Sequence, residues 1–577
     1  MIDHEDLALI WHVAHSTKAS PVEITHLPSS SDGTHLVLFI DGVRTIIKGR
    51  RERCYLPLAP IVAPEFNYDV LSQLFFEMQP HDDFVKLLQW LTTDVVADGL
   101  RQHPEVALLR FNGPILQDRN SVSRNSQIFD AVPSLISQRT LVEGTPLWTQ
   151  PLFTVPKSDG ETSRLILDCR QLNEWMCEIF GKVNMPLPEL RSVIDNILAH
   201  RLVWSADATS MFYQFRVADS LARFFGAYVG GRRGYFRKIL VWVLPMGWYW
   251  APAFAQHMSN YICNVTMQRA RQIGAEGHVC AWVDNYIILA NTQRDMDILV
   301  KVFLDLCESL RLQLKAAVIG PIITLLGLTF DMEQRVVRPA TGTLNALEED
   351  VRKFVDRENL SHRDFITWFG RIMWVNHAIM RTPLCFSHEV VDYLRNIARG
   401  GDWEGSSPAN GEVVNQMASL QTSALAACLY HGERGAETTN GELWSDASTT
   451  GLGAVWDYSG SSQLWRVACA FPNTAIFAAE LLGGFLGSKV LVENNIAFKW
   501  TTDNEAASRA LRRGHSASKI GDIIIARWIS QHPPKTVRLV PTECNISDPA
   551  SRGHNYVGGR CDHTSHYEGP CRWRPPT

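Results

Sequence analysis

Residues 278–290 read HVCAWVDNYIILA, a largely apolar run in which Asp284 and Asn285 form a polar pair. Such a pair inside a β-rich segment is expected at the turn of a hairpin, because burying an acid or an amide within a strand is costly. Two segments precede it: LVWSAD at 202–207, which ends in Asp207, and VLPMGWYWAPAF at 243–254, a turn that leads into a helix. The sequence therefore predicts two carboxylates at the ends of two strands.

Two acids at the ends of buried strands need a partner to offset the cost of their burial. Mg²⁺ prefers carboxylate oxygens and substrate phosphates. Two such ions about 3.5–4 Å apart stabilise both the attacking and the leaving oxygen of a phosphoryl transfer. Taken singly, Asp207 and Asp284 are ordinary turn acids, but their order around Leu-Pro-Met-Gly favours a metal-dependent phosphoryl-transfer site.

The three segments together resemble the fingers and palm of a reverse transcriptase. Residues 151–173, PLFTVPKSDGETSRLILDCRQLN, are similar to the fingers hairpin of that family, in which a lysine and an arginine grip the incoming triphosphate. Lys157 and Arg164 match those two positions. Two cations that flank a glycine-bearing turn also suit a polyphosphate on chemical grounds, and a solvated basic hairpin is the plainer alternative.

Four further residues match positions of the family that lie near the substrate. Phe212 stands where an aromatic steric gate would crowd a ribose 2′-hydroxyl and favour deoxynucleotides, although alone it would be interpreted as a core aromatic. Met246 and Gly247 occupy the Leu-Pro-Gln-Gly turn, with Met in place of the usual Gln. Lys315 matches a lysine near the leaving pyrophosphate, but a lone lysine after an amphipathic helix is common. LLGLTF at 325–330 resembles the start of the primer grip.

Asn285 stands where the family usually has a second aspartate. The replacement leaves two carboxylates, Asp207 and Asp284, opposite metal ions with a total charge of about +4. Because asparagine keeps a carbonyl oxygen as a ligand, metal would still bind, but more weakly. We therefore expect an active polymerase with an altered metal demand, and a catalytically silent one is the alternative.

Four more acids stand out in the C-terminal third, although each one alone is ordinary. They are Asp446 in a predicted hairpin (442–456), Glu480 on an apolar helix (477–486), Asp503 at the end of a strand (498–503) and Asp548 in a loop (540–552). In this order they resemble the catalytic set of the ribonuclease H domain of retroelements, and the loop resembles the Asn-x-x-Asp-x-x-Ser-Arg ending of gypsy-like and DIRS-like elements. The resemblance implies an intact two-metal hydrolase. His515 either assists product release or, as we expect, is a plain surface histidine.

The expected architecture is an α+β multidomain chain: a right-hand polymerase (fingers, palm, thumb) followed by an α/β ribonuclease H-like domain. The predicted boundaries are 1–125 for an N-terminal region of unknown role, 126–335 for fingers and palm, 336–440 for thumb and connection, 441–553 for ribonuclease H and 554–577 for a loosely ordered tail. The tail contains Cys561, His563, His566 and Cys571, whose irregular spacing favours chance over a metal site.

The domain order resembles that of a retrotransposon reverse transcriptase of DIRS-like, gypsy-like or trypanosomatid VIPER-like elements. The resemblance implies an RNA-directed DNA polymerase with ribonuclease H activity that uses Mg²⁺, or Mn²⁺ in its place. Asp207 and Asp284 would hold one set of ions, and Asp446, Glu480, Asp503 and Asp548 the other. The implied partners are an RNA template, a DNA primer, the RNA/DNA hybrid and deoxynucleoside triphosphates. Two alternatives stay open: a domesticated, polymerase-dead nucleic-acid-binding or scaffold protein, and a ribonuclease H with a structural palm.

The composition of the 577 residues limits which of these functions we expect. With 46% hydrophobic and 20% charged residues, the chain is globular rather than disordered. A formal net charge of −5 does not point to a polyanionic partner, so nucleic-acid binding is expected to need divalent metal and a local basic cleft. Scattered cysteines without a CxxC pair, an acidic N-terminus and interrupted apolar runs lead us to expect an intracellular protein, cytoplasmic or nuclear, without a membrane segment. No oligomeric state is predicted.

Overall fold

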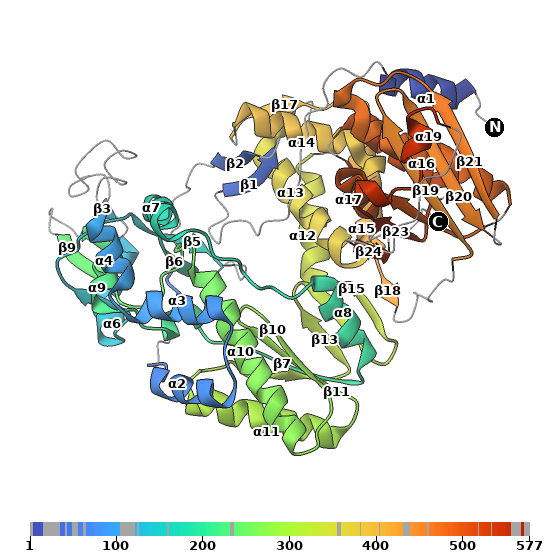
Figure 1. The fold of residues 1–577 in the computed structure, drawn as a ribbon. Helices are drawn as coiled ribbons and strands as arrows, with labels where there is room; N and C mark the ends of the chain where they lie inside the picture. Colours follow the sequence, from blue (N-terminus) through green and yellow to red (C-terminus); the bar gives the residue numbers. More distant parts are fainter. Residues whose placement is uncertain are drawn as a thin grey trace.

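A computed structural model describes residues 4–14, 35–40, 43–48, 56–61, 65–103, 122–123, 126–157, 161–230, 236–354, 359–380, 382–402, 404–430, 439–458, 461–494, 496–516, 518–531, 533–554 and 567–570. Within them, helices and strands form seven sheets, four of which have four or six strands (Figure 1). The turn at 158–160 and the group Cys561, His563, His566 and Cys571 lie outside the described residues. The expected mixture of helices and sheets is confirmed, whereas the division into fingers, palm and thumb stays a prediction.

The central sheet carries the predicted strand-end acids. Its antiparallel strands follow the order β10-β11-β7-β12: β7 (Leu202–Asp207), β10 (His278–Trp282), β11 (Asn285–Ala290) and β12 (Val318–Ile319). Alternate residues of a strand point to opposite faces. Ile288 belongs to the core that contains α10 (Ala251–Gln272) and α11 (Gln293–Ser309), and Ile287 to the core that contains α8 (Leu190–Ala199). Burial on both faces explains why β11 is apolar at nearly every position.

The first core also takes in further helices, three of them from the N-terminal region, and an outer sheet. The helices are α2 (Tyr68–Glu77), α3 (Asp82–Thr92), α4 (Val95–Gln102), α6 (Ser126–Ser137), α7 (Arg170–Phe180), η2 (Met211–Gln214) and α9 (Asp219–Ala222). The outer sheet has the order β3-β8-β9-β4: β3 (Val122–Ser123), β8 (Gly226–Gly230), β9 (Phe236–Val241) and β4 (Leu141–Glu143). The hairpin of β5 (Leu152–Pro156) and β6 (Ser163–Leu167) contacts it.

A second core joins the other face of the central sheet to a group of helices. It contains the sheet β13-β14-β15-β18: β13 (Ile322–Leu325), β14 (Leu328–Asp331), β15 (Val336–Pro339) and β18 (Leu429–Tyr430). The helices are α12 (Thr341–Arg352), α13 (His362–Val375), η4 (Asn376–Met380), η5 (Leu384–Ser387), α14 (His388–Gly400) and α15 (Gly411–Leu425), with a small pair β16 (Asn359–Ser361) and β17 (Ser406–Pro408).

The C-terminal unit is a six-stranded sheet with helices packed on it. Its order is β21-β20-β19-β22-β23-β24: β19 (Gly441–Ser448), β20 (Gly451–Tyr458), β21 (Ser461–Ala468), β22 (Phe498–Thr502), β23 (Thr536–Leu539) and β24 (Tyr567–Pro570). The first three strands are antiparallel, and β19, β22 and β23 are parallel. The helices are η6 (Asn473–Ala475), α16 (Ile476–Glu493), α17 (Glu505–Arg513), α18 (Lys519–Gln531), η7 (Thr542–Cys544) and α19 (Asp548–Ser551).

The helix of the C-terminal core is apolar on most of its surface. Among the described residues, Asn473–Glu493 is the one segment long and apolar enough to cross a membrane, with a mean hydropathy of 1.6. However, 72% of that window is buried inside the protein. A core helix of this kind is hydrophobic on most of its surface because sheet and helices cover most of it.

Both ends of the chain depart from the expected organisation. The N-terminal α1 (His4–Ala14) packs on α16 and α18 of the C-terminal unit, where Lys489 Nζ lies 2.5 Å from Asp6 Oδ2 (Figure 1). The expected N-terminal region is thus shared: α1 joins the C-terminal unit, α2 to α4 join the first core, and β1 (His35–Ile40) and β2 (Val43–Lys48) form a hairpin. Residues 567–570 form the edge strand β24 within what was expected to be a loosely ordered tail. The domain boundaries themselves stay predictions.

Candidate acidic active sites

The register of the central sheet brings the first pair of acids to one edge. Strands β7 and β11 are antiparallel, and Asn285 lies directly opposite Asp207. Asp284 occupies the two-residue turn between β10 and β11, and its carbonyl oxygen accepts a hydrogen bond of 2.7 Å from Ala208 N. We call Asp207, Asp284, Asn285 and Lys315 the first acidic centre.

The turn that carries Asp284 is strained and is held from behind by α10. Val283 has a φ of +55°, a conformation that is rare for a β-branched residue and normally taken by glycine in this type of hairpin. Gln256 Oε1 accepts a 2.7 Å bond from Val283 N, and Ser259 Oγ donates a 2.7 Å bond to Val283 O. Neither residue was predicted from the sequence to belong to the site. Their signal is a pair of polar residues one turn apart on a helix that is otherwise buried.

Both carboxylates of the first acidic centre have protein partners. Lys315 Nζ lies 3.0 Å from Asp207 Oδ2, and Asn285 Nδ2 donates a 3.1 Å bond to Asp284 Oδ1. Burial raises the pKa of Asp284, and the neighbouring Asp207 carboxylate raises it further, while Lys315 and Arg164 lower it. Lys315, expected near a leaving pyrophosphate, is thus bound to a carboxylate in this structure.

The hairpin β5–β6 presents the two predicted triphosphate-binding cations. Arg164 is exposed on β6, and its charge acts on Asp284, so the guanidinium lies within electrostatic reach of the first acidic centre. Lys157 follows β5, where its backbone N–H donates a 2.8 Å bond to Thr162 O across the hairpin. Phe212 is half-buried in η2 and packs against the first core, which fits the plain core role as well as a steric gate.

Gly247 is required by a close approach between two segments. It has a φ of +113°, and a Cβ atom there would lie 2.0 Å from Leu167 O on β6. Met246 contributes its carbonyl oxygen, which accepts a 2.9 Å bond from Leu167 N. The Met246–Gly247 turn is therefore fixed to β6 through its backbone, and its side-chain identity matters less than its shape.

The second acidic centre lies in the C-terminal unit, where three elements each supply one acid. Asp446 comes from β19, Glu480 from α16 and Asp503 from the end of β22, and one oxygen of each lies within 4.8 Å of the others. They line a hollow of about 420 Å³ together with Asp548 and Arg552. Asp548 lies outside the three-acid group and is paired with Arg552, whose Nη2 is 2.9 Å from its Oδ1.

Burial makes ionisation of the second centre costly. Glu480 is 3% exposed; its Oε1 accepts a 3.1 Å bond from Ala447 N, while Oε2 has no hydrogen-bond donor among the described residues. Burial raises the pKa of Glu480 well above its usual value, and the carboxylates of Asp446 and Asp503 raise it further. Burial also raises the pKa of Asp446 to about 7. A cation between the three acids would satisfy the unpartnered oxygen and offset the repulsion.

The loop before α19 supplies donors to these acids that were not predicted from the sequence. Asn545 Nδ2 donates a 3.0 Å bond to Asp503 Oδ1 and a 3.5 Å bond to Asp446 Oδ1. Ser551 Oγ donates to Asp446 Oδ2. The signal was present as the Asn-x-x-Asp-x-x-Ser-Arg pattern, in which only the aspartate had been given a role.

Comparison with known proteins finds similarity only at the level of solved structures. No family model and no curated protein matches the chain. A foamy viral protease-reverse transcriptase in complex with double-stranded DNA is 15% identical, with a TM-score of 0.44, over 78% of this chain and 92% of the other. The same protein with an RNA/DNA hybrid is 13% identical, with a TM-score of 0.43, over 92% and 71%. A dRH form with double-stranded DNA is 14% identical, with a TM-score of 0.43, over 82% and 83%.

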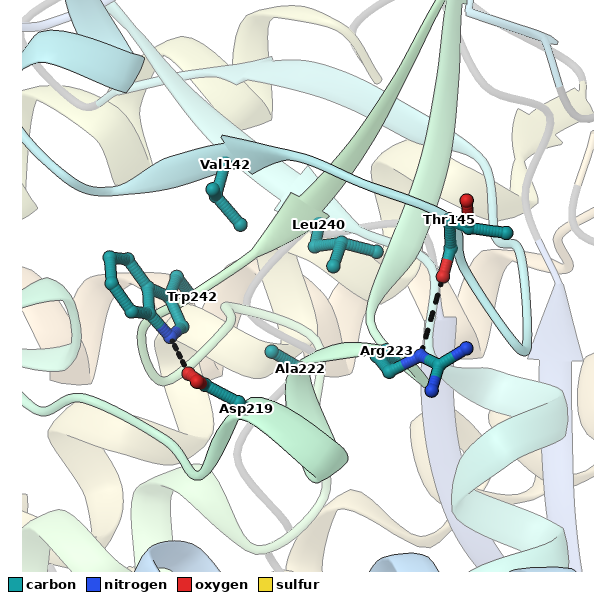
Figure 2. Close-up of a pocket in the computed structure, with 7 residues that line it drawn as sticks. All are labelled: Val142, Thr145, Asp219, Ala222, Arg223, Leu240 and Trp242. Atoms are coloured by element: carbon teal, nitrogen blue, oxygen red, sulfur yellow. Dashed lines mark hydrogen bonds between the residues drawn. The ribbon is translucent and has the colours of Figure 1, made fainter.

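A separate hollow of about 310 Å³ lies beside the outer sheet, between β4, β9 and α9 (Figure 2). None of the predicted site residues lines it. Its polar groups bond to one another: Trp242 Nε1 donates a 2.6 Å bond to Asp219 Oδ1, and Arg223 Nε a 3.5 Å bond to Thr145 O. The hollow is thus separate from the two acidic centres in position and in lining residues.

The expectation that His515 is a plain surface histidine is wrong. His515 is half-buried in the loop after α17, which packs against η5 and α14: Cys385 N donates a 3.0 Å bond to Gly514 O, and Arg395 Nη2 a 3.2 Å bond to Ser516 O. Burial lowers the pKa of His515 to about 4. The residue belongs to the contact between the C-terminal unit and the second core.

Proposed function

We propose that the chain is an RNA-directed DNA polymerase with ribonuclease H activity, which copies RNA into DNA and degrades the RNA of the hybrid. The observation that carries the proposal is the convergence of Asp446, Glu480 and Asp503 from three elements, in the same chain as the paired strand-end acids Asp207 and Asp284. Acids that approach one another this closely from separate elements are expected to be held together by a divalent cation.

The residues of the second acidic centre fit Mg²⁺ or Mn²⁺. All three ligands are hard oxygen donors, and the unpartnered Glu480 Oε2 lacks only a cation. When bound, such ions polarise a phosphate and activate the attacking water or hydroxyl. Asp446, Glu480 and Asp503 would hold them, and Asp548 on the rim could join once Arg552 turns to the phosphate backbone.

At the first acidic centre, the chain's own cations would receive the nucleotide. Asp207 and Asp284 are proposed to hold the metal, and Arg164 and Lys157 to neutralise the triphosphate, because guanidinium and ammonium groups are the usual partners of phosphate oxygens. Phe212 would face the ribose, the Met246–Gly247 turn would support the nucleotide, and Lys315 would move from Asp207 to the departing pyrophosphate. RNA template, DNA primer and deoxynucleotides are the proposed partners, in an intracellular retroelement of the DIRS-like, gypsy-like or VIPER-like kind.

A ribonuclease H with a purely structural first centre is the second candidate. The observation that favours it is that both acids there are already satisfied by the protein, Asp207 by Lys315 and Asp284 by the Asn285 amide. A site of this kind needs no cation to be stable. If the chain were only a polymerase-dead scaffold, in contrast, the second acidic centre would have no catalytic role.

Two parallel assays on the full chain test these proposals: primer extension on an RNA template, and cleavage of an RNA/DNA hybrid, each with Mg²⁺ and with Mn²⁺. We expect Asp207→Ala to abolish extension and spare cleavage, and Glu480→Gln to abolish cleavage and spare extension. Asp305→Ala on α11 and Glu493→Gln on α16 are the matched exposed controls. Cleavage without extension in both metals would favour the second candidate, and absence of both activities would refute the proposed enzyme.

A further inference from the structure

We infer that Asn545 and Ser551 are positioning residues of the second acidic centre: they hold Asp446 and Asp503 in a convergent arrangement before a divalent cation arrives. The inference rests on the proposed ribonuclease H function. It gives a role to two residues that touch neither the cation nor the substrate in this arrangement.

The orientation of the Asn545 amide is set by its own hydrogen bonds. Asn545 Oδ1 accepts bonds from Ser547 Oγ at 2.6 Å and from Ser547 N at 3.3 Å. The two donors leave one orientation for the amide, with Nδ2 turned toward the acids. Nδ2 then donates its two hydrogens to Ser445 O at 3.1 Å and Asp503 Oδ1 at 3.0 Å, and lies 3.5 Å from Asp446 Oδ1. Asn545 is 4% exposed, so water cannot readily replace these bonds.

Ser551 binds the opposite oxygen of Asp446. Its Oγ donates to Asp446 Oδ2, while the Asn545 amide nitrogen lies 3.5 Å from Oδ1, so a neutral polar group faces each oxygen of this carboxylate. The Ser551 backbone is fixed too, because its carbonyl oxygen accepts a 2.7 Å bond from Ser448 Oγ. Ser551 is 1% exposed. The rotamer of Asp446 is therefore determined from both sides.

Two glycines of β20 allow α19 to come close enough for these bonds. A Cβ atom on Gly453 would lie 2.4 Å from Ser551 N, and one on Gly451 would lie 3.1 Å from Ser551 O. The backbone of α19 therefore lies directly on β20. Two segments about a hundred positions apart in the chain therefore pack together. They are the Gly-Leu-Gly sequence and the Asn-x-x-Asp-x-x-Ser-Arg pattern.

The contacts of Asn545 and Ser551 counteract the repulsion between the three acids. Three carboxylates within 4.8 Å repel one another in the absence of metal, and unsupported side chains would rotate apart. Two buried neutral donors lower that repulsion without adding a cation that would compete with Mg²⁺ or Mn²⁺. Residues that orient metal ligands in this way typically contribute about 10–100-fold to metal affinity.

Mn²⁺ binding to the full chain, measured by calorimetry without nucleic acid, tests the inference. The Asp207→Ala background restricts binding to the second centre. We expect Ser551→Ala to weaken Mn²⁺ binding by about 10-fold. Hybrid cleavage by the same variant should lose rate at low Mn²⁺, recover at high Mn²⁺ and keep its KM for the hybrid. Ser488→Ala is the matched control, since Ser488 is equally buried in the same unit and bonds only to Phe485 O.

Asn545→Asp keeps the shape of the side chain but replaces the donor with a fourth carboxylate. We expect a lower melting temperature of the metal-free protein, and a larger rise on adding Mn²⁺ than in the wild type. Ser551→Ala binding within twofold of the Ser488→Ala control, or an unchanged metal-free melting temperature in Asn545→Asp, would overturn the inference. Wild-type protein that binds Mn²⁺ at this centre but cleaves no hybrid would refute the proposed function and leave the positioning role standing.

Discussion

In the first acidic centre, Asn285 supplies an amide at the position where a third carboxylate would complete the set. Its amide donates to Asp284 Oδ1 at 3.1 Å, so it stabilises the ionised acid as a neutral donor and not as an additional negative charge. Lys315 pairs with Asp207 in the same centre, so each carboxylate has one protein partner. A metal ion must displace Lys315 and the Asn285 amide from the two carboxylates. We therefore expect primer extension to need a high metal concentration.

The substitution Asn285→Asp should lower this demand. A third carboxylate attracts the cations and removes the donor that competes for Asp284, so the Mg²⁺ concentration for half-maximal primer extension should fall by about 10-fold. Asn291→Asp, an exposed site at the end of the same hairpin, is the control. An unchanged Mg²⁺ requirement in Asn285→Asp would contradict this account of the centre.

Asp446 should make the metal-free protein sensitive to pH. Its pKa is raised to about 7 by burial, from an unfolded value of about 3.9. Between these values the folded state binds more protons than the unfolded state, so the free energy of unfolding should fall as pH rises from about 4 to about 7. Because metal needs the ionised acid, Mn²⁺ affinity should rise over the same interval.

Melting temperatures of metal-free protein from pH 4 to pH 8 measure this effect. Asp446→Asn has no titrating group at this position, so its melting temperature should decline less with pH than that of the wild type. Equal slopes for the two proteins would show that the cost of ionisation lies elsewhere.

At the scale of elements, both centres depend on one element pressed closely on another. Helix α10 holds the strained turn at Val283, the Met246–Gly247 turn is fixed to β6, and α19 lies on β20. Each contact uses backbone atoms or a glycine, and each brings segments together that are far apart in the chain. The positions of the carboxylates therefore depend on these contacts between elements.

The substitution Gly453→Ala should break the contact between β20 and α19. Its Cβ would lie 2.4 Å from Ser551 N and 2.8 Å from Ala550 Cβ, so α19 must move outward. We expect a loss of about 1–3 kcal/mol in the free energy of unfolding and impaired hybrid cleavage. Gly483→Ala, whose Cβ would make an ordinary 3.6 Å contact with Asp446 O, is the control and should be neutral or stabilising. Similar losses in both variants would argue against the close packing of α19.

At the scale of the whole molecule, the N-terminal helix belongs to the C-terminal unit. Leu9, Ile10 and Val13 are buried in the same core as α16 and α18. Asp6, with a side chain 2% exposed, is paired with Lys489 Nζ at 2.5 Å. The second acidic centre therefore depends on residues from both ends of the chain, because Glu480 is on the helix that α1 covers.

Asp6→Ala should destabilise the C-terminal unit although it lies more than four hundred positions away in sequence. The substitution removes the buried carboxylate that pairs with Lys489, and breaking a buried ion pair costs about 3–5 kcal/mol. Hydrogen exchange of α16 and thermal inactivation of hybrid cleavage measure the loss. The double variant Asp6→Leu/Lys489→Met should recover much of it, and full stability of Asp6→Ala alone would contradict the role of α1.

A site residue could be predicted from the sequence where the signal lies in neighbouring residues along the chain, and not where it lies in contacts between separate elements. Asp446, Glu480 and Asp503 were singled out from sequence because their order along the chain resembles a ribonuclease H motif set, and the structure brings them together. Asp548 was placed in the same set, but it is paired with Arg552. Asn545, Ser551, Gln256 and Ser259 were not given roles, because their partners are backbone atoms and acids from other elements that no spacing rule reveals.

The sequence by itself determined the mixture of helices and strands and the positions of Asp207, Asp284 and Asp503 at strand ends, since these follow from apolar periodicity and turn chemistry. Only the tertiary structure decided which acids lie within 4.8 Å, that Lys315 binds Asp207, that His515 is half-buried and that α1 completes the C-terminal core. The physical reason is that distance, desolvation and pairing of charges arise between elements. They depend on how the whole chain packs, and a local sequence pattern carries no record of that packing.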